Sequence, residues 1–230
     1  MAKRRNLARC WFFCAHEERN RPNFERIIVG GIRNAASSGT KWGEAMRKLL
    51  VTGAHSTGKS GLASAIVEDM RLAGYSAVLV EDVARSCPFA IGLGQTDRGT
   101  MWLLHQQVAA ELRAEAGNAD WIVCDRGVPD ILAHWTEIGL RSGSQSELME
   151  RLKAYLTVWA QSYSDVFQSF IDERIPLIAD GLREPDPAYR VLMERLVVEE
   201  LQKLGVSSIS LPFGIEDRRA FVRSVLQLHN

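Results

Sequence analysis

The sequence lacks the features of membrane-spanning, disulfide-stapled and strongly charged proteins. No apolar run approaches the roughly 18 residues that a membrane-spanning helix needs. Four cysteines among 230 residues are too few for a disulfide scaffold, so we expect a cytoplasmic protein in a reducing compartment. Lys/Arg and Asp/Glu are balanced at 28 each, and the chain as a whole shows no charge that favours nucleic acid or a membrane surface as a partner.

The charge is nevertheless uneven along the chain. Residues 1–45 hold nine Lys/Arg and four Asp/Glu, whereas the remainder holds nineteen and twenty-four. This first segment also shows no sustained helical or strand period. We therefore interpret residues 1–45 as a flexible basic N-terminal extension, with a translation start at Met46 as the alternative, and residues 46–230 as a single α/β domain.

From Met46 onward, short apolar runs alternate with helical periods. This pattern is typical of a parallel sheet with helices on both faces. Strands are expected at Lys48–Thr52, Ala77–Glu81, Trp121–Asp125 and Val206–Leu211, with a further strand at either Asp165–Phe170 or Pro176–Ala179. Helices are expected at Lys59–Ala73, Thr100–Ala116, Pro129–Glu137, Ser146–Ser164, Pro187–Leu204 and Ile215–Leu228.

The first strand leads into a phosphate-binding (Walker A) motif that matches G-x-x-x-x-G-K-[ST] at every position. Its glycines let the chain turn sharply and wrap closely around an anion, and the backbone N–H groups and helix N-terminus supply positive partial charge. Lys59 is predicted to reach the β- and γ-phosphates and Ser60 to ligate Mg²⁺. The loop therefore predicts ATP and Mg²⁺ as cofactors. Its residues are Gly53, Ala54, His55, Ser56, Thr57, Gly58, Lys59 and Ser60.

A second acidic position separates the classes of P-loop protein. Asp125 ends an apolar strand, where such proteins hold a carboxylate directed at Mg²⁺. Arg126 follows it, whereas a motor ATPase usually places there a Glu that activates water. The N-K-x-D and D-x-x-G patterns of GTPases do not occur in the sequence. These observations favour phosphoryl transfer to a bound acceptor.

Four segments together resemble one group of small P-loop kinases. "GAHSTGKS", "VEDVAR", "CDRGVPD" and "DGLREPDPAYR" are similar to the ribosylnicotinamide kinase domain of the bifunctional NAD-biosynthesis regulator, often labelled an AAA-like ATPase domain. More broadly they are similar to thymidylate and deoxynucleoside kinases. The resemblance covers about residues 47–225 and implies a five-stranded parallel sheet in the order 2-3-1-4-5 with a helical lid.

The resemblance also implies roles for individual residues. Asp125 and Arg126 match an Asp-Arg pair whose arginine contacts phosphate or acceptor. Arg183 is the best candidate for a lid arginine, with Arg190 second. Near the acceptor lie the matches to an acid and an arginine after the second strand, together with a glutamine on the next helix. These are Glu81, Asp82, Arg85, and either Gln106 or Gln107.

Three assignments stay open at this point. Neighbouring strand residues point to opposite faces, so only one of Glu81 and Asp82 is expected to orient the acceptor hydroxyl or take its proton. Asp130 is expected either to orient Arg126 or to cap a helix. Arg218 is a candidate for flanking the adenine, with a solvated charge at a helix N-terminus as its alternative.

The sequence therefore predicts a kinase that transfers the γ-phosphate of ATP to a small nucleoside- or nucleotide-like acceptor. One alternative is a nucleotide-dependent switch or binding module with slow hydrolysis. Another is a polynucleotide-end kinase that uses the basic segment 1–45 as an anchor. The acceptor and the oligomeric state are not specified by the sequence.

Overall fold

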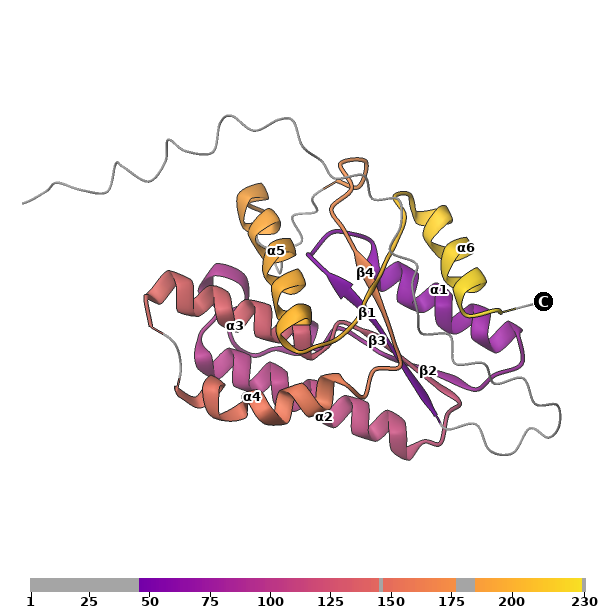
Figure 1. Cartoon of the computed structure of the whole chain (residues 1–230), viewed down its shortest axis with the longest axis horizontal. Helices are drawn as coiled ribbons and strands as arrows, with labels where there is room; N and C mark the ends of the chain where they lie inside the picture. Colours follow the sequence, from indigo (N-terminus) through magenta and orange to yellow (C-terminus); the bar gives the residue numbers. More distant parts are fainter. Residues whose placement is uncertain (1–45, 145–146, 177–184, 229–230) are drawn as a thin grey trace, which may run out of the picture. The chain divides into compact units, whose positions relative to one another are not determined.

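The computed structural model describes residues 46–144, 147–176 and 185–228 (Figure 1). The predicted extension 1–45 and the lid candidate Arg183 lie outside these ranges, as does most of the alternative strand Pro176–Ala179. Within the described ranges, none of the helices combines the length and the apolar character required to cross a membrane.

Five parallel strands form one sheet in the order β2-β3-β1-β4-β5, which confirms the predicted topology. The central strand β1 pairs in parallel with β3 on one side and with β4 on the other. The fourth strand is the first of the two predicted alternatives, and the fifth is shorter than expected. The strands are β1 Arg47–Gly53, β2 Ala77–Val80, β3 Trp121–Asp125, β4 Asp165–Ser169 and β5 Ile209–Ser210.

Helices follow the strands, and two of them begin at a side-chain cap. The Thr96 hydroxyl accepts from the Gly99 amide at the start of α2, and the Asp186 carboxylate accepts from the Ala188 amide at the start of α5. The helices are α1 Lys59–Leu72, α2 Asp97–Ala116, α3 Val128–Ser142, α4 Glu147–Ala160, α5 Pro187–Lys203 and α6 Ile215–Val225. Two short 3₁₀ turns, η1 Val83–Ser86 and η2 Gly92–Gly94, join β2 to α2.

The sheet separates two apolar cores because successive strand residues point to opposite faces. On one face, Leu49 and Val51 pack with residues of α1 and α6. On the other face, Leu50 packs with residues of α2, α3, α4 and α5. Figure 1 shows the same division, with α1 and α6 on one side of the strands and the other four helices on the opposite side.

The buried core of this sheet gives a direct stability prediction. Leu50→Ala, at a position with 0 % exposure, is expected to lower the free energy of unfolding by about 2–5 kcal/mol through lost burial and the cavity left behind. Leu72→Ala is the matched control, because Leu72 is 72 % exposed and its truncation is expected to change stability by less than about 0.5 kcal/mol. Urea unfolding of both variants measures the difference, and equal losses would contradict the assigned core.

Candidate active site

The phosphate-binding loop lies between β1 and α1, at the carboxyl end of the parallel sheet. Gly53 has a φ of 132°, and a Cβ there would lie 2.1 Å from the carbonyl oxygen of Ser169 on β4. Gly58 has a φ of 80° and precedes the first turn of α1. Both positions require glycine because their φ angles are positive, a conformation that other residues rarely adopt. At Gly53 the backbone of Ser169 also leaves no room for a Cβ.

Two buried arginines hold the carbonyl groups of this loop from outside. Arg190 on α5 donates from Nε to the His55 carbonyl oxygen at 3.2 Å and from Nη2 to the Ser56 carbonyl oxygen at 2.7 Å. Arg218 on α6 donates to the carbonyl oxygen of Thr57. Because the N–H and C=O of a peptide unit point in opposite directions, carbonyls held outward leave N–H groups facing the inside of the loop, as an anion site requires.

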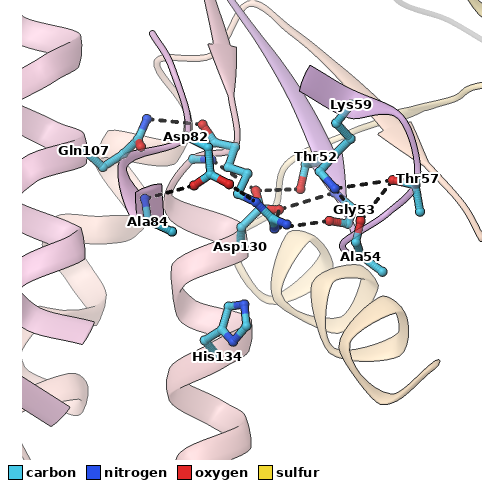
Figure 2. A network of polar contacts seen from close by, with 12 residues as sticks. Thr52, Gly53, Ala54, Thr57, Lys59, Asp82, Ala84, Gln107, Asp130 and His134 are labelled. Carbon is cyan, nitrogen blue, oxygen red and sulfur yellow. Dashed lines mark hydrogen bonds and ion pairs between the residues drawn. The ribbon is translucent and has the colours of Figure 1, made fainter. Parts of the chain in front are cut away.

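Lys59 turns back into the loop that it follows. Its side chain is buried, and Nζ donates to the Ala54 carbonyl oxygen and, at 3.3 Å, to Thr57 Oγ1 (Figure 2). Burial, followed by the positive charge of Arg126, lowers the pKa of Lys59 to about 7. A polyphosphate in the loop would supply the negative charge that this ammonium group lacks.

Arg126 joins the end of β3 to two carboxylates. Its Nε donates to Asp82 Oδ2 at 2.9 Å and its Nη1 to Asp130 Oδ1 at 3.2 Å. Burial alone lowers the pKa of Arg126, but the charges of Asp82 and Asp130 outweigh burial and raise that pKa above its ordinary value. The residue has a left-handed φ of 77°, which is uncommon for a side chain other than glycine. The guanidinium is therefore a permanent cation that is held in one place.

Asp130 performs both of the roles that the sequence left open. Its Oδ1 accepts from Arg126, and its Oδ2 accepts from the Gly127 amide at 3.1 Å at the start of α3. The same Oδ2 accepts from the Thr52 hydroxyl at 2.8 Å, at the end of β1 (Figure 2). Asp130 thus ties the phosphate-loop strand, the β3 arginine and the first turn of α3 together.

The two acidic candidates after β2 lie in different surroundings. Asp82 binds Arg126 and accepts from the Ala84 amide at 3.0 Å, whereas Glu81 is exposed. Burial alone raises the pKa of Asp82, but Arg126 outweighs burial and holds that pKa below its ordinary value. Asp82 is therefore the ionised carboxylate that the structure places against Arg126.

Asp125 fits the role of a carboxylate near a metal. It is buried at the end of β3, and its Oδ1 has no hydrogen-bond partner within the described part of the chain. A buried carboxylate oxygen without a donor is costly unless a cation or ordered water satisfies it. Ser60 is half-buried in the first turn of α1. This donor set of one carboxylate and one hydroxyl suits Mg²⁺, which takes its remaining oxygens from phosphates and water.

A cavity opens beside Arg126. Of the predicted acceptor residues, Asp82, Arg85 and Gln107 line it; Gln106 and Glu81 are not among its lining residues. Of the two glutamines that the sequence left open, Gln107 is the one that lines the cavity. The remaining walls come from the loop, η1, η2, α2, α3 and α5. They comprise His55, Val83, Ala84, Ile91, Gly92, Gln95, Leu103, Arg126, Asp130, Ile131, His134 and Tyr189.

Sequence reasoning missed His134 and Tyr189 in this cavity. His134 Nδ1 lies 3.2 Å from the Tyr189 hydroxyl, so α3 and α5 meet at the cavity wall. Burial, followed by the charge of Arg126, lowers the pKa of His134 to about 3, and the imidazole is therefore neutral. The signal for His134 was available, because residues four apart share a helix face and His134 lies four positions after Asp130. No neighbouring residue in the sequence indicated that Tyr189 lines the cavity.

Arg218 is bound to the protein by every hydrogen bond of its guanidinium that the structure describes. It is buried, and its guanidinium donates to the Pro212 carbonyl at 2.8 Å, to Ser169 Oγ at 2.9 Å and to the Thr57 carbonyl. The alternative of a solvated charge is therefore wrong for Arg218, which is 1 % exposed, and the adenine contact stays a prediction. Arg190, the second lid candidate, is likewise bound to the phosphate loop.

Comparison with known protein families identifies the family of this chain. Residues 48–219 match the family described as "AAA domain". The chain belongs to that family. Comparison with curated proteins finds no match.

Solved structures share the fold of this AAA domain at low sequence identity. Deoxyadenosine kinase from M. mycoides with the products dCMP and dCDP bound is 12 % identical, with a TM-score of 0.59 over 78 % of this chain and 98 % of that one. The same kinase with bound dATP is 13 % identical, with a TM-score of 0.54 over 79 % of this chain and 99 % of that one. The NadR protein in complex with NR is 15 % identical, with a TM-score of 0.61 over 80 % of this chain and 51 % of that one. At such identities the likeness shows the fold alone.

The low pKa of Lys59 makes the stability of this AAA domain depend on pH. The unfolded chain keeps the lysine protonated up to its ordinary value of 10.5, while the folded chain releases the proton near 7. Stability therefore rises with pH between these values, because the unfolded state binds more protons. From pH 7 to pH 9 the wild type is expected to gain about 2 kcal/mol of unfolding free energy relative to Lys59→Met.

Urea unfolding at the two pH values measures this gain. Lys153→Met on α4 is the matched control, because Lys153 is exposed and its replacement is expected to leave the gain unchanged. A Lys59→Met variant with the same pH dependence as the wild type would contradict the lowered pKa of the buried lysine.

Proposed function

We propose that this AAA domain is a kinase that transfers the γ-phosphate of ATP to a hydroxyl group of a small nucleoside-like acceptor. The observation that carries the proposal is the continuous chain of contacts from the phosphate loop to the cavity. Asp130 binds Thr52 at the start of the loop, Arg126 binds Asp130, and Asp82 binds Arg126 and lines the cavity. A phosphate in the loop and a hydroxyl in the cavity would meet at Arg126.

The charges in this chain suit phosphoryl transfer, which depends on positioning and charge stabilisation more than on covalent chemistry. Arg126 and Lys59 place two positive charges beside the transferring group. Asp82, which is ionised before the reaction, accepts the hydrogen bond of the acceptor hydroxyl and receives its proton as the new O–P bond forms and the bond from the γ-phosphorus to the departing ADP breaks. The Mg²⁺ that accompanies ATP neutralises phosphate charge, and Ser60 and Asp125 are the residues that would hold it.

The cavity itself supports a ring-bearing acceptor. His134, Tyr189, Ile131 and Leu103 offer flat or apolar surface, and Gln107 and Arg85 offer polar groups. The solved structures of similar fold contain deoxynucleotides or NR, which agrees with a nucleoside-like ligand. A nucleotide-dependent switch has no need of such a cavity, so we favour the kinase over that alternative.

Acceptor-dependent release of ADP tests the proposal. Purified protein with Mg²⁺ and ATP is assayed against nucleosides, nucleotides and ribosylnicotinamide. At least one acceptor is expected to raise turnover well above hydrolysis by water, and Lys59→Met is expected to lower that turnover at least about 100-fold. Lys153→Met serves as the control for loss of a lysine. ATP binding with flat, slow hydrolysis across the whole panel would instead support the switch.

The two adjacent carboxylates after β2 give a sharper test of the mechanism. Asp82→Asn is expected to lower kcat by about 100- to 10⁴-fold, because it removes both the proton acceptor and a partner of Arg126. Glu81→Gln removes a neighbouring exposed charge and is expected to change kcat by less than about threefold. Equal effects of the two substitutions on kcat would contradict the proposal that Asp82 accepts the proton of the acceptor hydroxyl.

A further inference from the structure

A buried ion pair lies behind the cavity and outside the chain of contacts described above. Lys48 on β1 donates from Nζ to Glu111 Oε2 at 3.0 Å and to Glu115 Oε1 at 2.7 Å, both on α2. Lys48 and Glu111 are 2 % and 0 % exposed. Burial alone lowers the pKa of Lys48, but the two carboxylates outweigh burial and raise it above its ordinary value, so the lysine is charged.

Every contact of the Glu111 carboxylate comes from a hydrogen-bond donor. Besides Lys48, Oε2 accepts from Trp159 Nε1 at 2.9 Å, and Oε1 accepts from the Tyr163 hydroxyl at 2.7 Å. Oε1 also accepts from Gln107 Nε2 at 2.9 Å. Lysine and tryptophan side chains can only donate, so Glu111 is held as an acceptor on all sides.

This carboxylate decides which way the Gln107 amide faces. Gln107 Nε2 donates to Glu111 and, at 3.2 Å, to the backbone carbonyl of Arg126, and neither of these groups can donate in return. Rotating the amide by half a turn would place its oxygen against two acceptors and lose both hydrogen bonds. The amide oxygen must therefore face the other way.

The oxygen that is left over has no partner within the described ranges. Gln107 is 0 % exposed, its Oε1 accepts no hydrogen bond, and the residue lines the cavity beside Asp82 (Figure 2). A buried carbonyl oxygen without a donor is costly to leave unsatisfied. A ligand that brings an N–H or O–H group to this point would satisfy it.

We propose that the Lys48–Glu111 pair sets the hydrogen-bonding polarity of the cavity, by holding Gln107 so that it can only accept from the ligand. Glu111 is thus a positioning residue that does not touch the acceptor, and Gln107 is the residue through which it acts. The inference rests on the proposed function for the identity of the ligand as an acceptor substrate. It assigns that acceptor a chemical class: a ring that carries an N–H or O–H donor, and an exocyclic amino group is the case tested below.

The orientation of the amide can be measured without any ligand. In ¹⁵N-labelled protein, the side-chain NH₂ signal of Gln107 is identified by its absence in Gln107→Leu. Glu111→Gln is expected to speed the exchange of these protons with water by about tenfold or more, because the fixed acceptor is lost. Glu115→Gln is the matched control, since it removes the other carboxylate of Lys48 without touching Gln107. Equal exchange in the two variants would overturn the proposal.

A specificity measurement then tests the consequence for the ligand. Adenosine and cytidine are each compared with the analogue that lacks the exocyclic amino group. The wild type and Glu115→Gln are expected to favour the amino-bearing nucleoside by about tenfold or more in kcat/KM, while Glu111→Gln and Gln107→Leu bring the ratio close to one. A ratio unchanged by Glu111→Gln would contradict the assigned polarity, because loss of stability alone does not alter a ratio.

The two proposals fail in different ways. A panel in which no nucleoside is phosphorylated contradicts the proposed function, and the exchange measurement still decides the orientation of Gln107. If Glu111→Gln does not fold, slow exchange of the Gln107 amide protons in the wild type tests whether they are held by their two acceptors, and Gln107→Leu tests through the ratio whether the ligand meets this residue.

Discussion

The guanidinium of Arg126 is the charge on which the rest of the site depends. A cation in a largely buried position is stable only beside carboxylates, and Asp82 and Asp130 supply them. Those two acids come from different segments, one following β2 and one in the first turn of α3. The two ion pairs of Arg126 therefore connect the ends of the neighbouring strands β2 and β3. Because Asp130 also binds Thr52, they connect these ends to the beginning of the phosphate loop as well.

The phosphate loop is supported from the opposite side by a different kind of contact. Arg190 and Arg218 donate to backbone carbonyls, so they shape the loop without neutralising an acid. They come from α5 and α6, which lie on opposite faces of the sheet. The loop is thus held between the two layers of helices, at the edge of a parallel sheet where ligands of α/β proteins commonly bind.

Behind the cavity, the Lys48–Glu111 pair shows how a buried charge can act on a site that it does not touch. The pair fixes an amide group, and the amide presents a single acceptor to the cavity. A neutral imidazole at His134 adds flat surface without further positive charge. The cavity therefore has one end at which Arg126 is paired with Asp82 and Asp130, while most of its other walls are neutral residues.

The sequence by itself determined the sheet order through the resemblance, the phosphate loop through its motif, and the strand-end position of Asp125 and Arg126 through the apolar run before them. These features are local, because each depends on residues that are close together in the chain. Only the tertiary structure showed that Asp82 rather than Glu81 binds Arg126, that Gln107 rather than Gln106 lines the cavity, and that Arg218 binds the phosphate loop. Each of those outcomes depends on a partner more than 15 residues away in the sequence, and neither propensity nor spacing reports which distant charge or carbonyl a side chain will meet.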